Sequence, residues 1–85
     1  MQDCKVNILG TEWEIKFGDE SQYPNLEGID GYCDSSIKEI VVDDMKKSEG
    51  RTGAKENLKE YQRICLRHEI IHAFMEESGL SGNFE

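Results

Sequence analysis

The sequence is poor in basic residues, contains a single proline and lacks any long apolar run. Lysine and arginine total 10 against 18 acidic residues, so the 85-residue chain carries a net charge of −8. This balance predicts no nucleic-acid binding and no attraction to an anionic membrane surface, because both require clustered basic side chains. No apolar run approaches the length that spans a bilayer. The length predicts one small domain, residues 1–85.

Disulfide-forming and secretion signals are also missing. The three cysteines, Cys4, Cys33 and Cys65, are odd in number and include no C-x-x-C pair, which excludes a disulfide framework. Reduced thiols are typical of the cytosol. The N-terminus lacks the basic and then apolar pattern of a signal peptide. These features predict a cytoplasmic protein.

Alternating hydrophobicity in the first half predicts strands. Residues 5–17 alternate apolar and polar side chains around Gly10-Thr11, which predicts a β-hairpin with a type II′ turn. Residues 18–31 are rich in glycine and turn formers, which indicates a loop with a short helical turn. Residues 34–36 suit a turn, and residues 37–43, with the IVV run at their centre, predict the strongest strand.

The second half predicts one long helix, residues 54–78, ended by Gly79 with Leu80 placed for an apolar contact. The helix has two apolar faces, which indicates a central element. One face carries Tyr61, Ile64, His68, Ile71, His72 and Met75, and the other carries Leu66, Ile70, Ala73 and Glu77. The predicted fold class is therefore α+β: a small sheet, made of the hairpin and a strand near 37–43, packed on one helix.

The only two histidines of the chain form an H-E-x-x-H motif on this helix, His68-Glu69-Ile70-Ile71-His72. Residues four apart stand one turn apart on the same helix face, so both imidazoles can converge on one tetrahedral ion. Glu69 lies about 100° around the helix, where it can reach a water held by the ion. The motif predicts a zinc site with His68 and His72 as ligands.

A strand, a polar loop and a long helix with this motif resemble the zincin metallopeptidase core. The similarity is to small gluzincin-like proteins of phages and mobile elements, and in layout to the ImmA/IrrE and SprT-like groups. Three segments carry it: residues 31–34 (GYCD), 40–43 (IVVD) and 67–74 (RHEIIHAF). The resemblance covers residues 31–80, and only the histidine–glutamate motif within it is specific.

The resemblance implies a minimal zincin-like core and a zinc-dependent metallopeptidase that acts on a peptide or protein substrate. His68 and His72 would hold the cofactor, Zn²⁺, and Glu69 would be the catalytic general base and proton shuttle. It further implies that the strand at 38–43 binds an extended peptide along its edge.

The third zinc ligand is left open by the sequence. Met75 and Ser78 stand where a metzincin has its glycine and third histidine. Glu76 is one turn past His72 on nearly the same helix face. On a straight helix it lies too far along the axis to share the ion comfortably with the two histidines. Glu85 follows two glycines that would let the chain fold back and bring it to the ion. The other options are a C-terminally incomplete core, a ligand from another molecule, or a site with two protein ligands that is completed by water.

Two weaker candidates share the histidine side of the helix. Cys65 gives a Cys-x-x-His spacing but is better explained as a small core cysteine, and Tyr61 could assist an oxyanion but is better explained as a core tyrosine. Trp13 and Phe17 are expected in the sheet core. An apolar helix face left uncovered would favour a homo-oligomer.

Two other functions remain open. The chain could be a non-catalytic zinc-binding interaction or regulatory module, or an α+β domain that binds no metal. Metal analysis separates the last from the other two, and a Glu69→Gln variant separates a peptidase from a module that only binds zinc.

Overall fold

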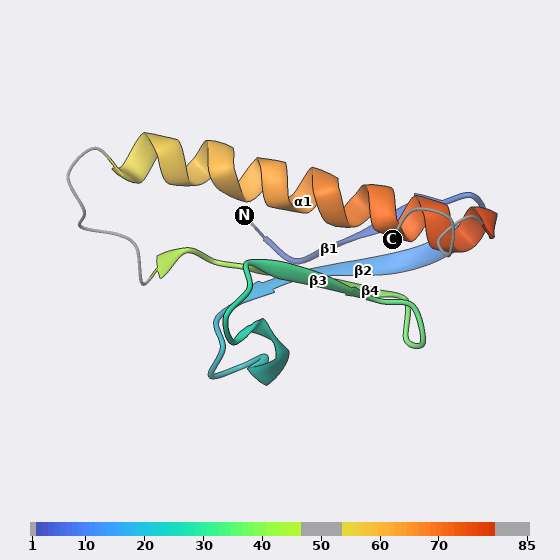
Figure 1. The fold of residues 1–85 in the computed structure, drawn as a ribbon. Coiled ribbons are helices and arrows are strands. Elements are labelled where there is room, and N and C mark those ends of the chain that lie inside the picture. The colour runs from blue at the N-terminus through green and yellow to red at the C-terminus, as the bar shows by residue number, and fades with distance from the viewer. Residues whose placement is uncertain (1, 47–53, 80–85) are drawn as a thin grey trace.

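A four-stranded mixed sheet and one C-terminal helix make up the chain in a computed structural model that describes residues 2–46 and 54–79. The elements are β1 (Cys4–Ile8), β2 (Thr11–Gly18), the short 3₁₀ helix η1 (Pro24–Leu26), β3 (Gly31–Asp34), β4 (Glu39–Asp43) and α1 (Ala54–Ser78). Their order in the sheet is β1-β2-β4-β3, with β2 and β4 parallel and the other pairs antiparallel. Figure 1 shows α1 lying along one face of the sheet and η1 on the opposite side. The predicted α+β class is confirmed.

The hairpin formed by β1 and β2 is confirmed, but its predicted turn is wrong. Ile8 pairs with Thr11, so the two loop residues are Leu9 and Gly10 rather than Gly10 and Thr11. Both have positive φ, 50° and 89°, which is the combination of a type I′ turn and not of type II′. The Asn7 side chain accepts a 2.9 Å hydrogen bond from the Gly10 N–H. The position of the turn was mispredicted because Leu9 is its first loop residue, where asparagine or glycine is usual.

Strand β3 was not predicted from the sequence, and its presence changes which strand lies at the edge of the sheet. The sequence indicated a turn-rich segment here, yet Gly31–Asp34 pairs antiparallel with β4. Strand β4 therefore lies between β2 and β3, and both its edges are occupied. The expectation that residues 38–43 offer an edge to a peptide is wrong for this reason. That strand also begins two residues later than predicted, at Glu39, because Ile37 and Lys38 belong to the turn.

The core lies between the sheet and α1. Side chains of the helix-facing side of the sheet alternate along the strands, as period-2 patterning predicts. The buried members are Ile8, Trp13, Ile15, Ile40 and Val42, and they pack with Ala73 of the helix. Phe17 is partly buried against this cluster, so both predicted aromatic core residues lie in the core.

The helix bounds match the prediction, and the structure decides which helix face is covered. Leu66, Ile70 and Ala73 turn toward the sheet, whereas Ile64 and Ile71 are 48% and 53% exposed. The helix ends at Ser78, and Gly79 follows with φ 78°, as a C-terminal glycine stop requires. The predicted contact of Leu80 lies outside the described residues. Thus one apolar face of α1 packs on the core and the other faces outward.

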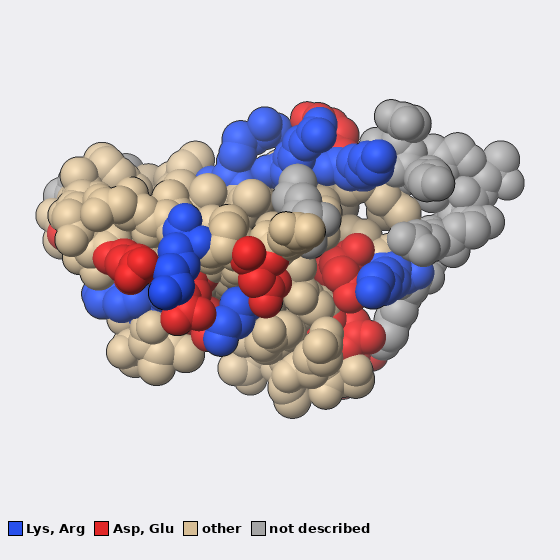
Figure 2. Space-filling view, turned by 180° about the vertical axis from the view of Figure 1, so that it is seen from behind, with Lys and Arg blue, Asp and Glu red and all other residues tan. Residues whose placement is uncertain are grey.

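Charged side chains of both signs are interspersed on the surface. Figure 2 shows lysine and arginine beside aspartate and glutamate over the face seen from behind. On α1, Arg63 and Arg67 both approach Glu60, at 3.7 and 3.4 Å. Within residues 2–46 and 54–79, no helix is long and apolar enough to cross a membrane.

An ion pair between Lys38 and Glu77 connects the C-terminal end of the helix to the sheet. The Glu77 carboxylate accepts a 2.8 Å hydrogen bond from Lys38 Nζ and a 2.9 Å bond from the Thr11 hydroxyl. Lys38 Nζ also lies 5.3 Å from the centre of the Trp13 ring. These contacts join the turn before β4, the start of β2 and the last turn of α1.

Candidate metal centre

The two histidines of the motif converge, as their spacing predicts. His68 and His72 are both exposed on α1, and their Nε2 atoms lie 3.0 Å apart. The ring centroids are 4.6 Å apart, and the rings meet edge to face at 73°. The two Nε2 atoms are within hydrogen-bonding distance, with donor and acceptor set by the ring tautomers. Each ring therefore turns the same nitrogen toward its neighbour. The helix alone produces this geometry, because the two residues are one turn apart.

This pair of nitrogens fits a zinc ion. Two imidazole nitrogens bound at the usual zinc distance to a tetrahedral ion lie about 3.3 Å apart. The observed 3.0 Å separation requires only a small side-chain adjustment to reach that value. Imidazole nitrogen is also a ligand type that suits zinc. Solvent exposure of both rings leaves room for an ion and for water or substrate around it.

Glu69 lies between the helix and the sheet, next to the histidines. A Cβ placed on Gly31 would be 3.4 Å from Glu69 Cγ and 3.1 Å from the Val41 carbonyl oxygen, so the glycine lets the glutamate approach β3 closely. Partial burial raises the pKa of Glu69 above its ordinary value, and the charges of His68 and His72 act in the opposite direction. A carboxylate whose pKa is raised toward neutrality is a better proton acceptor from a polarised water.

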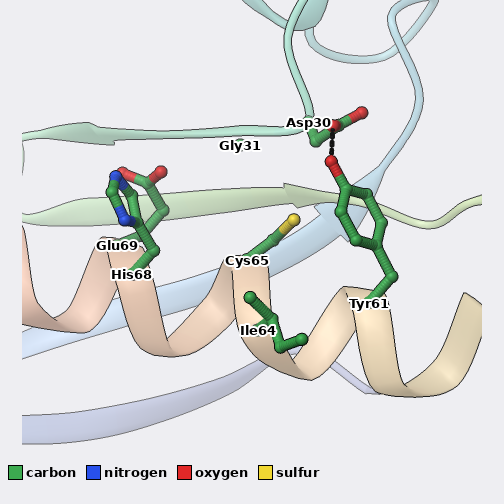
Figure 3. Close-up of a pocket in the computed structure, with 7 residues that line it drawn as sticks. All are labelled: Asp30, Gly31, Tyr61, Ile64, Cys65, His68 and Glu69. Carbon is green, nitrogen blue, oxygen red and sulfur yellow. Dashed lines mark hydrogen bonds between the residues drawn. The ribbon is translucent and has the colours of Figure 1, made fainter.

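A pocket of about 270 Å³ opens between the N-terminal part of this site and the start of β3. Figure 3 shows His68 and Glu69 at one end of it and Asp30 with Tyr61 at the other. The lining residues are Asp30, Gly31, Tyr61, Ile64, Cys65, His68 and Glu69. The pocket therefore joins two of the three predicted site residues to a loop that the motif did not include.

Tyr61 differs from its predicted role as a core tyrosine. Its side chain is 44% exposed, and its hydroxyl donates a hydrogen bond to Asp30 Oδ2. This hydrogen bond, together with the charge of Asp30, raises the pKa of Tyr61 to about 12. The phenol therefore stays protonated and links the loop before β3 to the helix. Asp30 was not predicted as a residue of the site, because nothing in the turn-rich sequence around it indicates a contact with the helix.

The cysteines near the site behave as partly buried thiols. Burial is the main cause that raises the pKa of Cys65 and that of Cys33, the latter to about 11. The charges of Glu69 and Glu76 raise the pKa of Cys33 further. Cys65 packs against the core and lines the pocket, which agrees with its interpretation as a small core residue.

Within residues 2–46 and 54–79, the structure brings no third ligand to the histidines. Among the residues described, no group of three or more His, Cys, Asp or Glu side chains is arranged to hold a metal ion. Glu76 is exposed, and Glu77 is engaged by Lys38 and Thr11, away from the histidines as expected. Glu85 lies outside the described residues.

Comparison with known proteins adds no relative. No protein-family model matches the chain, and neither the curated proteins nor the solved structures contain a significant match. The interpretation of the site therefore rests on its own residues.

Proposed function

We propose that this chain is the zinc-binding core of a zincin-like metallopeptidase, with His68 and His72 as metal ligands and Glu69 as general base. The observation that carries the proposal is the 3.0 Å approach of the two Nε2 atoms beside a half-buried glutamate whose pKa is raised by burial. A pocket that opens beside His68 and Glu69 supplies space for a substrate.

The chemistry divides between the ion and the protein. Zinc, when bound, lowers the pKa of its water and polarises the scissile carbonyl. His68 and His72 would hold the ion through their ring nitrogens on the exposed side of α1. Glu69 accepts the proton of the attacking water and delivers it to the leaving amine. The close packing of Glu69 at Gly31 holds the carboxylate near β3, so that it does not swing into solvent.

Strand β3 is the best placed element to bind the peptide backbone. It is the edge strand of the sheet on the side of Glu69, and its outer edge has no partner strand among those described. An extended peptide can add to such an edge through main-chain hydrogen bonds. Because Gly31 contacts Glu69, a peptide on β3 would run past the general base.

The decisive experiment compares wild type with Glu69→Gln. Both proteins are loaded with zinc, and hydrolysis of an unfolded protein is followed while zinc affinity is measured separately. The peptidase proposal expects hydrolysis by wild type to fall by at least about 100-fold in the variant, with zinc affinity retained. Glu27→Gln, an exposed carboxylate outside the pocket, is the matched control and should change neither quantity. Equal hydrolysis by wild type and Glu69→Gln would refute the proposal.

A second candidate is a zinc-binding interaction module that does not cut peptides. The observation that favours it is the outward apolar face of α1, where Ile64, Ile71 and Phe74 are each about half exposed. Such a face beside a metal site suits a partner surface. This candidate expects zinc binding that depends on both histidines, no hydrolysis, and no effect of Glu69→Gln on partner binding.

A further inference from the structure

The pocket beside the histidines extends well past the residues that the peptidase chemistry uses. From Glu69 it runs along α1 toward the N-terminal end of the helix and ends at Asp30, just before β3 (Figure 3). Ile64 and Cys65 line its middle. A peptide bound on β3 beside Glu69 would therefore place one of its side chains into this extension.

The walls of the extension carry negative charge, an aromatic ring and an aliphatic side chain. Asp30 is held in place by the hydrogen bond that Tyr61 donates to it. The Tyr61 ring and the Ile64 side chain are both more than two-fifths exposed, so both are available for contact. Among the residues that the structure describes, no lysine or arginine lines the pocket. A carboxylate next to an aromatic ring favours a cation, and an aliphatic wall favours a methylene chain.

We propose that this pocket receives a lysine or arginine side chain of the substrate. Its cationic head lies beside Asp30 and the Tyr61 ring, and its methylene stem lies along Ile64. The identification of the ligand as a substrate rests on the proposed peptidase function, whereas binding of the side chain needs no metal. The net charge of −8 assists by attracting basic peptides at long range.

The test measures side-chain binding directly by NMR titration of the full chain, free of metal. Nα-acetyl-lysine amide is the probe, and Nα-acetyl-norleucine amide is its uncharged counterpart with a similar stem. The proposal expects the lysine amide to bind about fivefold more tightly, since an exposed ion pair and a cation–π contact are each modest. Backbone resonances of Gly31, Tyr61 and Cys65 should shift. Equal binding of the two amides, or no binding of either, overturns the proposal.

Two variants separate recognition from a merely structural link between Asp30 and Tyr61. Asp30→Asn keeps an oxygen that accepts the Tyr61 hydrogen bond but removes the charge. It should erase the preference for lysine over norleucine and leave thermal stability nearly unchanged. Glu27→Gln removes the same charge from the same loop, outside the pocket, and should keep the preference. A preference that survives Asp30→Asn, or that is lost equally in Glu27→Gln, contradicts the proposal.

The experiments distinguish a wrong assignment of the pocket from a wrong proposal of peptidase function. If the chain prefers lysine but shows no histidine-dependent zinc binding, the pocket assignment is supported and the metallopeptidase proposal is refuted. Hydrolysis that depends on Glu69 but shows no difference between lysine-containing and norleucine-containing peptides would remove the pocket assignment alone.

Discussion

At the scale of single residues, Glu69 is a partly buried carboxyl group beside the two histidines. Burial raises its pKa in the folded chain above the ordinary value of 4.5. The folded state therefore holds this proton more tightly than the unfolded state does. The resulting stabilisation is fully present below the ordinary pKa and is lost as pH rises through the raised, folded-state value. At neutral pH the ionised, partly buried carboxylate destabilises the metal-free protein.

Glu69→Gln should consequently raise the Tm of the metal-free chain at neutral pH and give little gain below pH 4.5, where the wild-type carboxyl is protonated. Circular dichroism melts in the presence of a chelator measure both values. Glu27→Gln, which is exposed, serves as the control and should be neutral at both pH values. A Glu69→Gln variant less stable than wild type at neutral pH would show that the carboxylate is well solvated.

The residues of the site were only partly predictable. His68, Glu69 and His72 follow from a spacing that a helix converts directly into proximity. Asp30 could not be found in this way, because its contact with Tyr61 joins residues 31 positions apart and depends on how β3 docks. The role of Gly31 was hidden for the same reason, since its close approach to Glu69 is a tertiary contact.

At the scale of elements, the β1–β2 hairpin contains a testable strain. Leu9 occupies the left-handed region at φ 50° although its side chain is 58% exposed and has little packing to offset the strain. Leu9→Asn should stabilise the chain by about 1 kcal/mol, since Asn-Gly is the preferred type I′ pair. This corresponds to a Tm increase of about 4–8 °C for a domain of this size.

The control for this change is Ile29→Asn. Ile29 is also an exposed, large apolar residue, but its φ is not positive. The same substitution there removes apolar surface without relieving a turn, and the Tm should not rise. A comparable Tm increase in both variants would mean that surface polarity, and not the turn, is responsible.

The docking face of α1 gives a second prediction at this scale. Ala73 is fully buried against the sheet, whereas Ile71 is 53% exposed on the outer face. Ala73→Leu should cost about 1–3 kcal/mol through overpacking. Ile71→Lys should change stability by no more than about 0.5 kcal/mol. Urea denaturation measures both, and the reverse order of effects would mean that the helix packs through its other apolar face.

The presence of the helix and of the main strands was easier to predict from the sequence than the way in which the strands pair. The long helix and the IVV strand have strong local signals, and the helix bounds agree with the prediction while the strand differs only in its start. The four-residue strand β3 has a weak signal, because Gly31 begins it and its burial is intermediate throughout. Pairing order is a property of the whole sheet. The parallel contact of β2 with β4, which makes β3 the edge, could not be read from local periodicity.

At the scale of the whole molecule, the outward face of α1 predicts self-association. Ile64 and Ile71 lie on this face, and a contiguous apolar surface tends to be covered in solution. We expect a concentration-dependent homo-oligomer in sedimentation experiments and a monomer for the double variant Ile64→Lys, Ile71→Lys. A double variant at Ile29 and Ile37, which are exposed on loops and not on α1, should associate as wild type does. A wild-type monomer at high concentration would contradict this expectation.

If His68 and His72 together bind zinc, the zinc affinity of the chain must depend on both imidazoles. Competition titration with a chromophoric chelator is performed on wild type, on the double variant His68→Ala, His72→Ala, and on Cys65→Ser. We predict measurable binding of one zinc ion by wild type, a loss of more than about tenfold in the double variant, and retained affinity in Cys65→Ser. Equal zinc affinity of wild type and the double histidine variant would contradict the account.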